Sequence, residues 1–322
     1  MNITTFAATM NQWGQEKVPF LFVVDFEMQQ PLLIRLQDVD AATLLYQIQG
    51  ITNADHVAPA GSVTLEKMPL PQREYQRKFD AVYAHLAYGD SFLTNLTVKT
   101  EVKTDRSLRD IFHLSRARYK LLFDNRFLVF SPEIFVQIKD KKIYSFPMKG
   151  TMDAALPQAR ERLLADPKEI AEHVTIVDLI RNDLSQVASG VHVSRFRYIE
   201  EIQTASKTLL QVSSEVVGDL EADYAAHIGD ILVRLLPPGS VSGAPKPKTL
   251  EIIRDVEQEQ RGYYTGVFGV FDGEGLDSGV MIRFIEKQGD RYFYRSGGGI
   301  TTQSTAASEY QEVIDKVYVP LT

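Results

Sequence analysis

One lysine, two residues after a proline and directly before a glycine, is a candidate for chemistry. It is Lys149, in the stretch Phe146–Thr151. Proline fixes φ on the entry side and glycine allows a sharp bend on the exit side, so we expect a turn where an extended segment gives way to a helix. An amine held on such a turn can face a ligand, with Thr151 as a polar neighbour. Because most lysines are solvated surface residues, the rest of the chain must support this role.

Two predicted helices each carry a Glu-x-x-Glu pair, and these pairs are candidates for a metal site. They are Glu169 with Glu172 and Glu309 with Glu312. Carboxylates three residues apart share one helix face, which in either pair alone could be plain solvated surface. Brought together, four carboxylates would repel one another unless a cation compensated them, and an all-oxygen set suits Mg²⁺. The spacing does not show that the two helices meet.

Glycine-rich segments and one arginine are candidates for binding an anion. Backbone N–H groups are available in 239–246, which leads into a helix, and in Gly297–Gly299. Neither segment is a known nucleotide signature, and glycine clusters are often only turns. Arg283 ends the apolar run Val280–Ile282 of a predicted strand, which indicates a carboxylate partner. That partner could equally be a buried ion pair or a ligand.

Glu133 is the candidate proton donor. It follows the strand break Ser131–Pro132, within a predicted hairpin over residues 126–146 whose returning arm leads to Lys149. If the hairpin is right, Glu133 and Lys149 lie on adjacent strands or at one mouth of the sheet. A carboxyl and an amine in a shared cleft could divide the roles of acid and nucleophile. The alternative is a surface glutamate beside a turn.

Strands outnumber helices along the chain, and most strands are joined as hairpins. Apolar runs at 19–26 and 31–36 predict buried strands. Helical periodicity appears at 72–88, at 159–187 with an interruption near Pro167, at 225–235 and at 308–318. There is no internal repeat or linker. We therefore expect an α+β fold, mainly antiparallel sheets with helices packed outside, in one large domain over residues 1–322.

Composition excludes several classes of protein. The chain has 322 residues, a formal charge of −7 and no cysteine. Disulfides, thiolate metal sites and cysteine nucleophiles are therefore excluded, and the negative charge disfavours a nucleic-acid surface. The N-terminus does not read as a signal peptide, and no apolar run reaches the roughly 18 residues of a membrane span. We expect a cytoplasmic protein with neither membrane nor nucleic-acid partners.

Nine segments, taken together and in this order, resemble the chorismate-utilising enzymes over nearly the whole chain. Within that family they are most similar to the aminodeoxychorismate synthase component I enzymes, which share a fold with anthranilate synthase component I. The segments are GDSFLTNLT (89–97), SPEIF (131–135), PMKGT (147–151), KEIAEHVTIVDLIRNDL (168–184), PPGSVSGAPK (237–246), RGYYTGVFGVF (261–271), MIRF (281–284), GGG (297–299) and SEYQEVIDK (308–316).

The resemblance implies a role for each matching residue. Lys149 matches the nucleophile that attacks C2 of chorismate and expels the C4 hydroxyl, and Glu133 matches the general acid/base that assists this departure. Glu172 and Glu312 match direct Mg²⁺ ligands, with Glu169 and Glu309 as supporting carboxylates. The positions that hold the substrate or line its site match Thr151, Ser242, Gly243, Ala244, Tyr264, Arg283, Gly297, Gly298 and Gly299.

The same resemblance implies a reaction and a partner. Chorismate and ammonia would give 4-amino-4-deoxychorismate, on the route to para-aminobenzoate and folate, by amino transfer to chorismate. The ammonia would come from glutamine through a partner glutamine amidotransferase subunit. Two departures from the family pattern stand out. Where relatives carry a histidine in a His-Leu-Val-Ser stretch, this chain has residues 210–214 with Gln211, which cannot supply a proton. Little sequence precedes the first apolar run, so tryptophan binding is not expected.

Three alternative functions would each require other residues than those of this chain, or would not require the ones it has. Anthranilate synthase component I usually has alanine where Lys149 stands, and it lets ammonia attack C2 directly. Isochorismate and salicylate synthases activate water with a lysine in a Lys-Val-Val-Leu-like stretch, which corresponds here to Leu93–Leu96. A non-catalytic chorismate-binding homologue would not need the glutamates and Lys149 intact. We therefore favour the aminodeoxychorismate-forming reaction.

Overall fold

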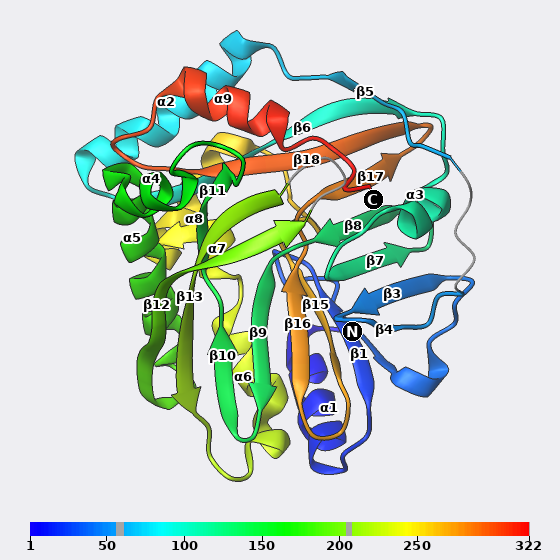
Figure 1. The fold of residues 1–322 in the computed structure, drawn as a ribbon. Coiled ribbons are helices and arrows are strands. Elements are labelled where there is room, and N and C mark those ends of the chain that lie inside the picture. The colour runs from blue at the N-terminus through cyan, green and yellow to red at the C-terminus, as the bar shows by residue number, and fades with distance from the viewer. Residues whose placement is uncertain (56–60, 204–207, 322) are drawn as a thin grey trace.

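Two antiparallel β-sheets form the centre of this chain, and helices pack around them (Figure 1). The computed structural model describes residues 1–55, 61–203 and 208–321. The expected α+β class with mainly antiparallel sheets is confirmed. No helix in these ranges is long and apolar enough to cross a membrane.

The first sheet has the strand order β11-β13-β10-β9-β16-β15-β1-β2, with β12 paired to β13. The strand β1, within the apolar run 19–26 that predicted it, is buried at every position, because alternate side chains enter two hydrophobic clusters. The strands of this sheet are β1 (Phe20–Val24), β2 (Leu32–Arg35), β9 (Ile134–Lys139), β10 (Lys142–Ser145), β11 (Met148–Asp153), β12 (Ser189–Gln203), β13 (Thr208–Asp219), β15 (Val267–Phe271) and β16 (Leu276–Val280).

The second sheet has the order β14-β6-β18-β17-β8-β7-β3-β4, with β5 paired to β6. The three consecutive glycines lie in β18, opposite residues 95–97 of β6. The strands of this sheet are β3 (Leu44–Ile48), β4 (Ile51–Thr52), β5 (Leu65–Met68), β6 (Leu93–Thr104), β7 (Tyr119–Phe123), β8 (Phe127–Ser131), β14 (Gly243–Ala244), β17 (Phe284–Gln288) and β18 (Arg291–Ile300).

The predicted interruption of the long helical segment is confirmed, because α4 ends at Ala165 and α5 begins at Pro167. Proline is tolerated in the first turn of a helix, where its missing N–H would be unpaired anyway. The helices are α1 (Ile3–Gln15), α2 (Gln72–Tyr88), α3 (Leu108–Leu114), α4 (Ala159–Ala165), α5 (Pro167–Leu184), α6 (Ile228–Leu235), α7 (Gly239–Ser242), α8 (Lys246–Glu257) and α9 (Ala306–Asp315), with 3-10 turns η1 (Leu36–Asp38) and η2 (Tyr224–His227).

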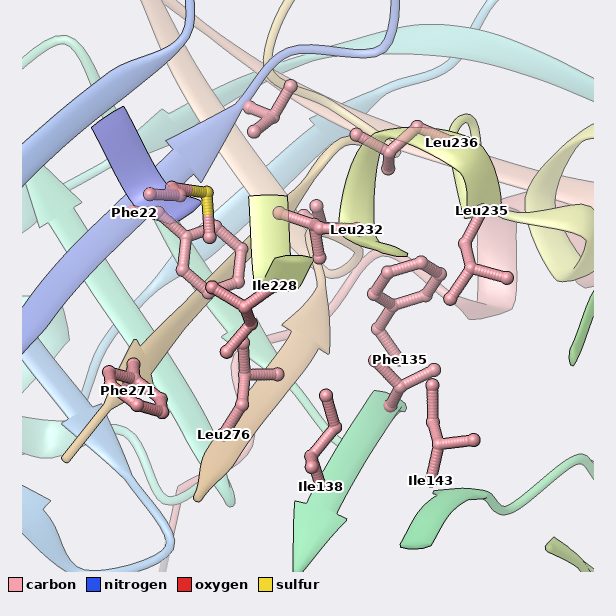
Figure 2. Packing of buried hydrophobic residues seen from close by; sticks show 14 of the residues in the cluster. Phe22, Phe135, Ile138, Ile143, Ile228, Leu232, Leu235, Leu236, Phe271 and Leu276 are labelled. Carbon is pink, nitrogen blue, oxygen red and sulfur yellow. The ribbon is translucent and has the colours of Figure 1, made fainter. Parts of the chain in front are cut away.

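The largest hydrophobic cluster lies between the first sheet and the helices α1 and α6. Figure 2 shows Leu232 and Leu235 of α6 beside Phe135 of β9, with Leu276 of β16 below them. Burying each such side chain contributes about 1.5–3 kcal/mol relative to leaving it exposed. This packing fixes the end of α6, from which the chain enters the loop of residues 237–246.

The predicted hairpin over 126–146 is only partly right. Strands β9 and β10 do form a hairpin, but β8 belongs to the second sheet, where it pairs with β7 and β17. Glu133 therefore lies where the chain crosses from one sheet to the other. Arg283 lies at the opposite crossing, between β16 and β17, and not inside a strand as predicted. The two crossings are joined by hydrogen bonds, since Val280 N–H donates to the Glu133 carbonyl and Phe130 N–H donates to the Arg283 carbonyl.

Candidate active site

Lys149 lies within the strand β11, and not on the predicted turn into a helix. It pairs with Val212 of β13, and the pairing shifts between Lys149 and Thr151, where Gly150 adopts a φ of +75°. The helix begins only at Ala159. A bulge of this kind redirects the neighbouring side chain, so the glycine acts as predicted although the element differs. The Lys149 amine nitrogen Nζ lies 3.7 Å from Oε2 of Glu172.

Gly150 also brings α5 close to this strand. A Cβ atom at Gly150 would lie 2.9 Å from Oε2 of Glu169 and 3.1 Å from Cδ1 of Leu163. A larger residue would therefore be strained in its backbone and would push against the helix. The result is that both glutamates of the first pair, Glu169 and Glu172, face the bulge next to Lys149.

The second glutamate pair lies against the glycines of β18. A Cβ atom at Gly298 would lie 3.3 Å from Oε2 of Glu309 and 3.8 Å from Oε1 of Glu312, and one at Gly299 would lie 3.7 Å from Nζ of Lys149. The missing side chains of two consecutive glycines thus let the α9 carboxylates and the β11 lysine approach the same stretch of strand.

Lys316 forms an ion pair with Glu312 of this second pair, although the sequence did not predict Lys316 as a site residue. Its amine lies 2.6 Å from Oε1 of Glu312 and donates a 2.8 Å hydrogen bond to the Gly297 carbonyl. Burial lowers the pKa of Lys316, while the carboxylate of Glu312 opposes that shift. The only signal for Lys316 was its position four residues after Glu312, at the end of SEYQEVIDK.

The chemistry of these carboxylates fits the predicted metal. Glu169 and Glu172 on α5 and Glu309 and Glu312 on α9 supply only oxygen donors, which is the set that Mg²⁺ prefers. Glu172 and Glu312 each lie beside a lysine amine. Within the described ranges, no three carboxylates or histidines are gathered closely enough to form a metal site. The magnesium site therefore stays a prediction.

Glu133, just before β9, is close enough to Lys149 for their charges to interact, although β9 does not pair with β11. The Ser240 hydroxyl donates a 2.5 Å hydrogen bond to Oε1 of Glu133. Burial raises the pKa of Glu133, and the opposing influences are the Ser240 hydrogen bond and the positive charges of Lys149, Lys316 and Arg283. A carboxyl that burial keeps protonated to a higher pH than an exposed glutamate is better suited to giving a proton.

Arg283 immediately precedes β17, and Tyr264 packs against Phe284, the first residue of that strand. Arg283 adopts a φ of +52°, and its guanidinium donates a 3.3 Å hydrogen bond to the Lys316 carbonyl and lies 5.0 Å from the ring of Tyr318. The Tyr264 ring is buried, 5.7 Å from the ring of Phe284, and burial raises the Tyr264 pKa to about 12. Tyr264 is therefore a neutral phenol at physiological pH.

The remaining predicted substrate positions lie on two neighbouring segments. Gly243 has a φ of +126°, and a Cβ atom there would lie 1.9 Å from the carbonyl oxygen of Leu93, so no other residue fits. Gly243 and Ala244 pair with residues 93–94 of β6. The Leu93 side chain in turn contacts Gly299. The loop of residues 242–244 thus meets the glycines of β18 through Leu93.

Thr151 is exposed and pairs with Gln211 of β13. Gln211 stands where the family members carry a histidine. A different histidine, His173, follows Glu172 in α5 and is buried. Its Nε2 lies 2.6 Å from the Ser214 hydroxyl, and its Nδ1 has no hydrogen-bond partner among the described residues. Burial, with lesser contributions from the charges of nearby Arg197 and Lys149, lowers the His173 pKa to about 4.

The model of one protein family, described as chorismate binding enzyme, matches residues 22–322. The chain belongs to the chorismate-binding enzyme family. A relative in Pasteurella multocida, named an uncharacterized PabA-like protein, is 50% identical over 100% of both chains. Aminodeoxychorismate synthase component 1 of Bacillus subtilis is 31% identical over 78% of this chain and 55% of that protein. The solved structure of anthranilate synthase component I from Streptococcus pneumoniae aligns at a TM-score of 0.68 and 25% identity, covering 81% of this chain and 60% of that one.

Family membership confirms the resemblance that the nine segments carried. It also establishes the coarse activity, which is enzymatic work on chorismate. The relatives whose names state a reaction do not agree on a single reaction, because aminodeoxychorismate synthases and anthranilate synthases both occur among them. The choice between these reactions depends on the residues of the site.

Proposed function

We propose that this chain is the chorismate-aminating subunit of an aminodeoxychorismate synthase, which forms 4-amino-4-deoxychorismate for para-aminobenzoate and folate synthesis. The observation that carries this proposal is the position of Lys149. Its amine lies between a carboxylate of α5 and the glycines of β18, in the region that also contains Glu133. An amine in that place supplies a nucleophile that belongs to the protein itself, which a direct amination at C2 would not need.

The first half of the reaction uses Lys149 and Glu133. The Lys149 amine, once it has lost its proton, forms a bond to C2 of chorismate. The two conjugated ring double bonds each shift one position toward C4, and the bond between C4 and its hydroxyl oxygen breaks. Glu133 gives its proton to that oxygen, which leaves as water. Because burial raises the Glu133 pKa, the carboxyl holds this proton at a higher pH than an exposed glutamate would.

The second half reverses the bond shift. Ammonia forms a bond to C4, both ring double bonds return to their original positions, and the bond between C2 and the Lys149 nitrogen breaks. Glu133, now a carboxylate, takes the extra proton of the added nitrogen. Both halves thus require one carboxyl that first gives and then accepts a proton, and one amine that first attacks and then leaves.

The charged groups of the site suit a substrate with two carboxylates. Arg283 and Lys316 are cationic, and the backbone N–H groups of the β18 glycines can donate. Mg²⁺ held by Glu172 and Glu312, with Glu169 and Glu309 in support, would neutralise one substrate carboxylate. Thr151, Tyr264 and residues 242–244 would complete the walls. These assignments follow the family pattern. They are supported by the approach of Lys149, Glu309 and Glu312 to the β18 glycines and by the pairing of residues 243–244 with β6.

Ammonia would come from a glutamine amidotransferase subunit. Hydrolysis of glutamine by triad-type glutaminases requires a cysteine nucleophile, and this chain has none. The amination site and the glutamine site would therefore be on separate chains.

The test is turnover with the product identified by mass spectrometry. The purified chain is incubated with chorismate, Mg²⁺ and an ammonium salt, and 4-amino-4-deoxychorismate is the expected product. Anthranilate would instead support direct attack at C2, and isochorismate would support water as the nucleophile. Binding of chorismate without any turnover would support a non-catalytic homologue, and each of these three results contradicts the proposal.

A further inference from the structure

Ser240 contacts the candidate acid from a distant part of the chain. Its hydroxyl donates to Oε1 of Glu133, 107 positions away in the sequence, at 2.5 Å. Ser240 lies in the short helix α7, which follows α6 and precedes α8 along the chain. A hydrogen bond to a carboxylate at this distance is among the strong ones that proteins make.

The backbone on both sides of Ser240 is anchored. The Gly239 N–H donates to the Asp183 carboxylate of α5, and that carboxylate also lies 3.1 Å from the amine of Lys246. On the other side, the Arg261 guanidinium donates a 2.7 Å hydrogen bond to the Val241 carbonyl. A serine on a mobile loop would lose its partner often, whereas this one is held through both of its neighbours.

The surroundings of the pair favour one fixed arrangement. A small cavity beside Glu133 and Ser240 has mostly apolar walls, including Phe135, Leu184 and Leu235. Asp183 is the other acidic group that lines it. On the substrate side, the charged groups that act on Glu133 are Lys149 of β11, Lys316 after α9 and Arg283 of the sheet crossing.

We infer that Ser240 is a positioning residue for Glu133, which holds Oε1 so that Oε2 is the oxygen that gives and takes the proton. In a protonated carboxyl, the oxygen without hydrogen is the better acceptor, so a hydroxyl that donates to Oε1 leaves the proton on Oε2. In the carboxylate, the same hydroxyl keeps Oε1 occupied and leaves Oε2 to accept. Ser240 therefore serves both halves of the reaction without changing its own hydrogen bond. The inference rests on the proposed role of Glu133.

The experiment compares Ser240→Ala and Ser240→Thr with the wild-type chain. The first readout is the titration of the Glu133 carboxyl, followed by NMR in the full chain labelled with ¹³C-glutamate and assigned through Glu133→Gln. The second readout is the pH dependence of kcat and of KM for chorismate. Ser194→Ala is the matched control, because Ser194 donates a 2.6 Å hydrogen bond to Glu215 on the exposed surface of β12 and β13.

Loss of the hydroxyl removes a bond that favours the carboxylate, so Ser240→Ala should raise the Glu133 pKa. We expect kcat to fall about tenfold or more, with KM nearly unchanged, because general acid–base catalysis contributes at least that much. Ser240→Thr should restore both readouts, and Ser194→Ala should match the wild type. If Ser240→Ala does not fold, Ser240→Cys replaces it, since a thiol is only a weak donor.

A Glu133 titration and a kcat profile that are unchanged in Ser240→Ala would overturn the inference. The two readouts also separate it from the proposed function. If the wild type makes no 4-amino-4-deoxychorismate, the proposed function fails, while the NMR titration still decides whether Ser240 controls Glu133. If the wild type makes that product and Ser240→Ala matches it in both readouts, only the inference about Ser240 fails.

Discussion

The amine of Lys149 in β11 lies 3.7 Å from a carboxylate oxygen of Glu172 in α5. The two side chains retain 29% and 16% of their exposure, so the pair is partly screened by water. Ion pairs of this kind contribute about 1 kcal/mol or less to stability. The contact therefore contributes little to the stability of the fold. Its significance is that it brings a candidate nucleophile beside a candidate metal ligand.

Replacement of Lys149 by alanine should remove the covalent route while leaving the fold intact. The wild type, incubated with chorismate but no ammonia, should gain mass as the adduct forms, and Lys149→Ala should not. Intact-protein mass spectrometry measures this directly. Lys142→Ala is a suitable control, because the Lys142 side chain on β10 is 43% exposed and its amine pairs with Asp219 of β13, away from the site. A variant that makes 4-amino-4-deoxychorismate at the wild-type rate would show that Lys149 only binds.

Replacement of Glu312 by glutamine should reduce turnover by about a hundredfold or more if this carboxylate holds Mg²⁺. Loss of one charged ligand weakens the metal, and it also leaves the Lys316 amine without its 2.6 Å partner. Activity is measured against Mg²⁺ concentration, and excess EDTA should abolish it in the wild type. Glu251→Gln provides a comparison, since Glu251 forms an exposed pair with Lys248 on α8. Full activity in EDTA would rule out the metal assignment.

The single chain should use ammonium salts but not glutamine. A chain with no cysteine lacks the nucleophile of triad-type glutaminases. Product formation is measured with each nitrogen source, before and after addition of a purified glutamine amidotransferase subunit. Glutamine should support turnover only after that addition. Efficient use of glutamine by the chain alone would contradict the proposed division of labour.

Loss of the Arg261 guanidinium should strongly destabilise the protein. Arg261 and Glu257 are each about 1% exposed, and two hydrogen bonds of 2.9 and 2.6 Å join them. Arg261→Met would leave a buried carboxylate uncompensated, which costs about 3–5 kcal/mol. Urea unfolding followed by circular dichroism measures the change. The double variant with Glu257→Gln should regain part of the loss, and an Arg261→Met midpoint equal to that of the wild type would refute this account.

His173 should make the fold sensitive to acid. Its pKa in the folded chain is about 4, below the ordinary 6.5, so the unfolded chain binds more protons between these values. Stability from this group is therefore full above about pH 6.5 and falls as the pH drops toward 4, by about 3 kcal/mol in total. Urea unfolding of wild type and His173→Gln, in EDTA at several pH values, isolates this contribution. Parallel pH profiles of the two proteins would exclude it.

The sequence predicted the features that depend on a single strand or helix. The buried strand β1 and the break at Pro167 are confirmed, and the shared helix face of each glutamate pair agrees with the structure. Each of these features depends on the local sequence of one strand or helix. The nine segments likewise predicted the family, since motif order is a property of the chain itself.

Only the tertiary structure decided which segments meet. Lys149 stands in a bulged strand because Gly150 pairs irregularly against β13, and Glu133 stands at a sheet crossing because β8 and β9 join different sheets. Ser240 and Lys316 were missed for the same reason. Their partners Glu133 and Gly297 lie 107 and 19 positions away, and strand pairing between distant segments sets such contacts. The sequence by itself determined the chemical groups and their local faces. Long-range pairing and packing brought Lys149 beside Glu172, and the α9 glutamates beside the glycines of β18.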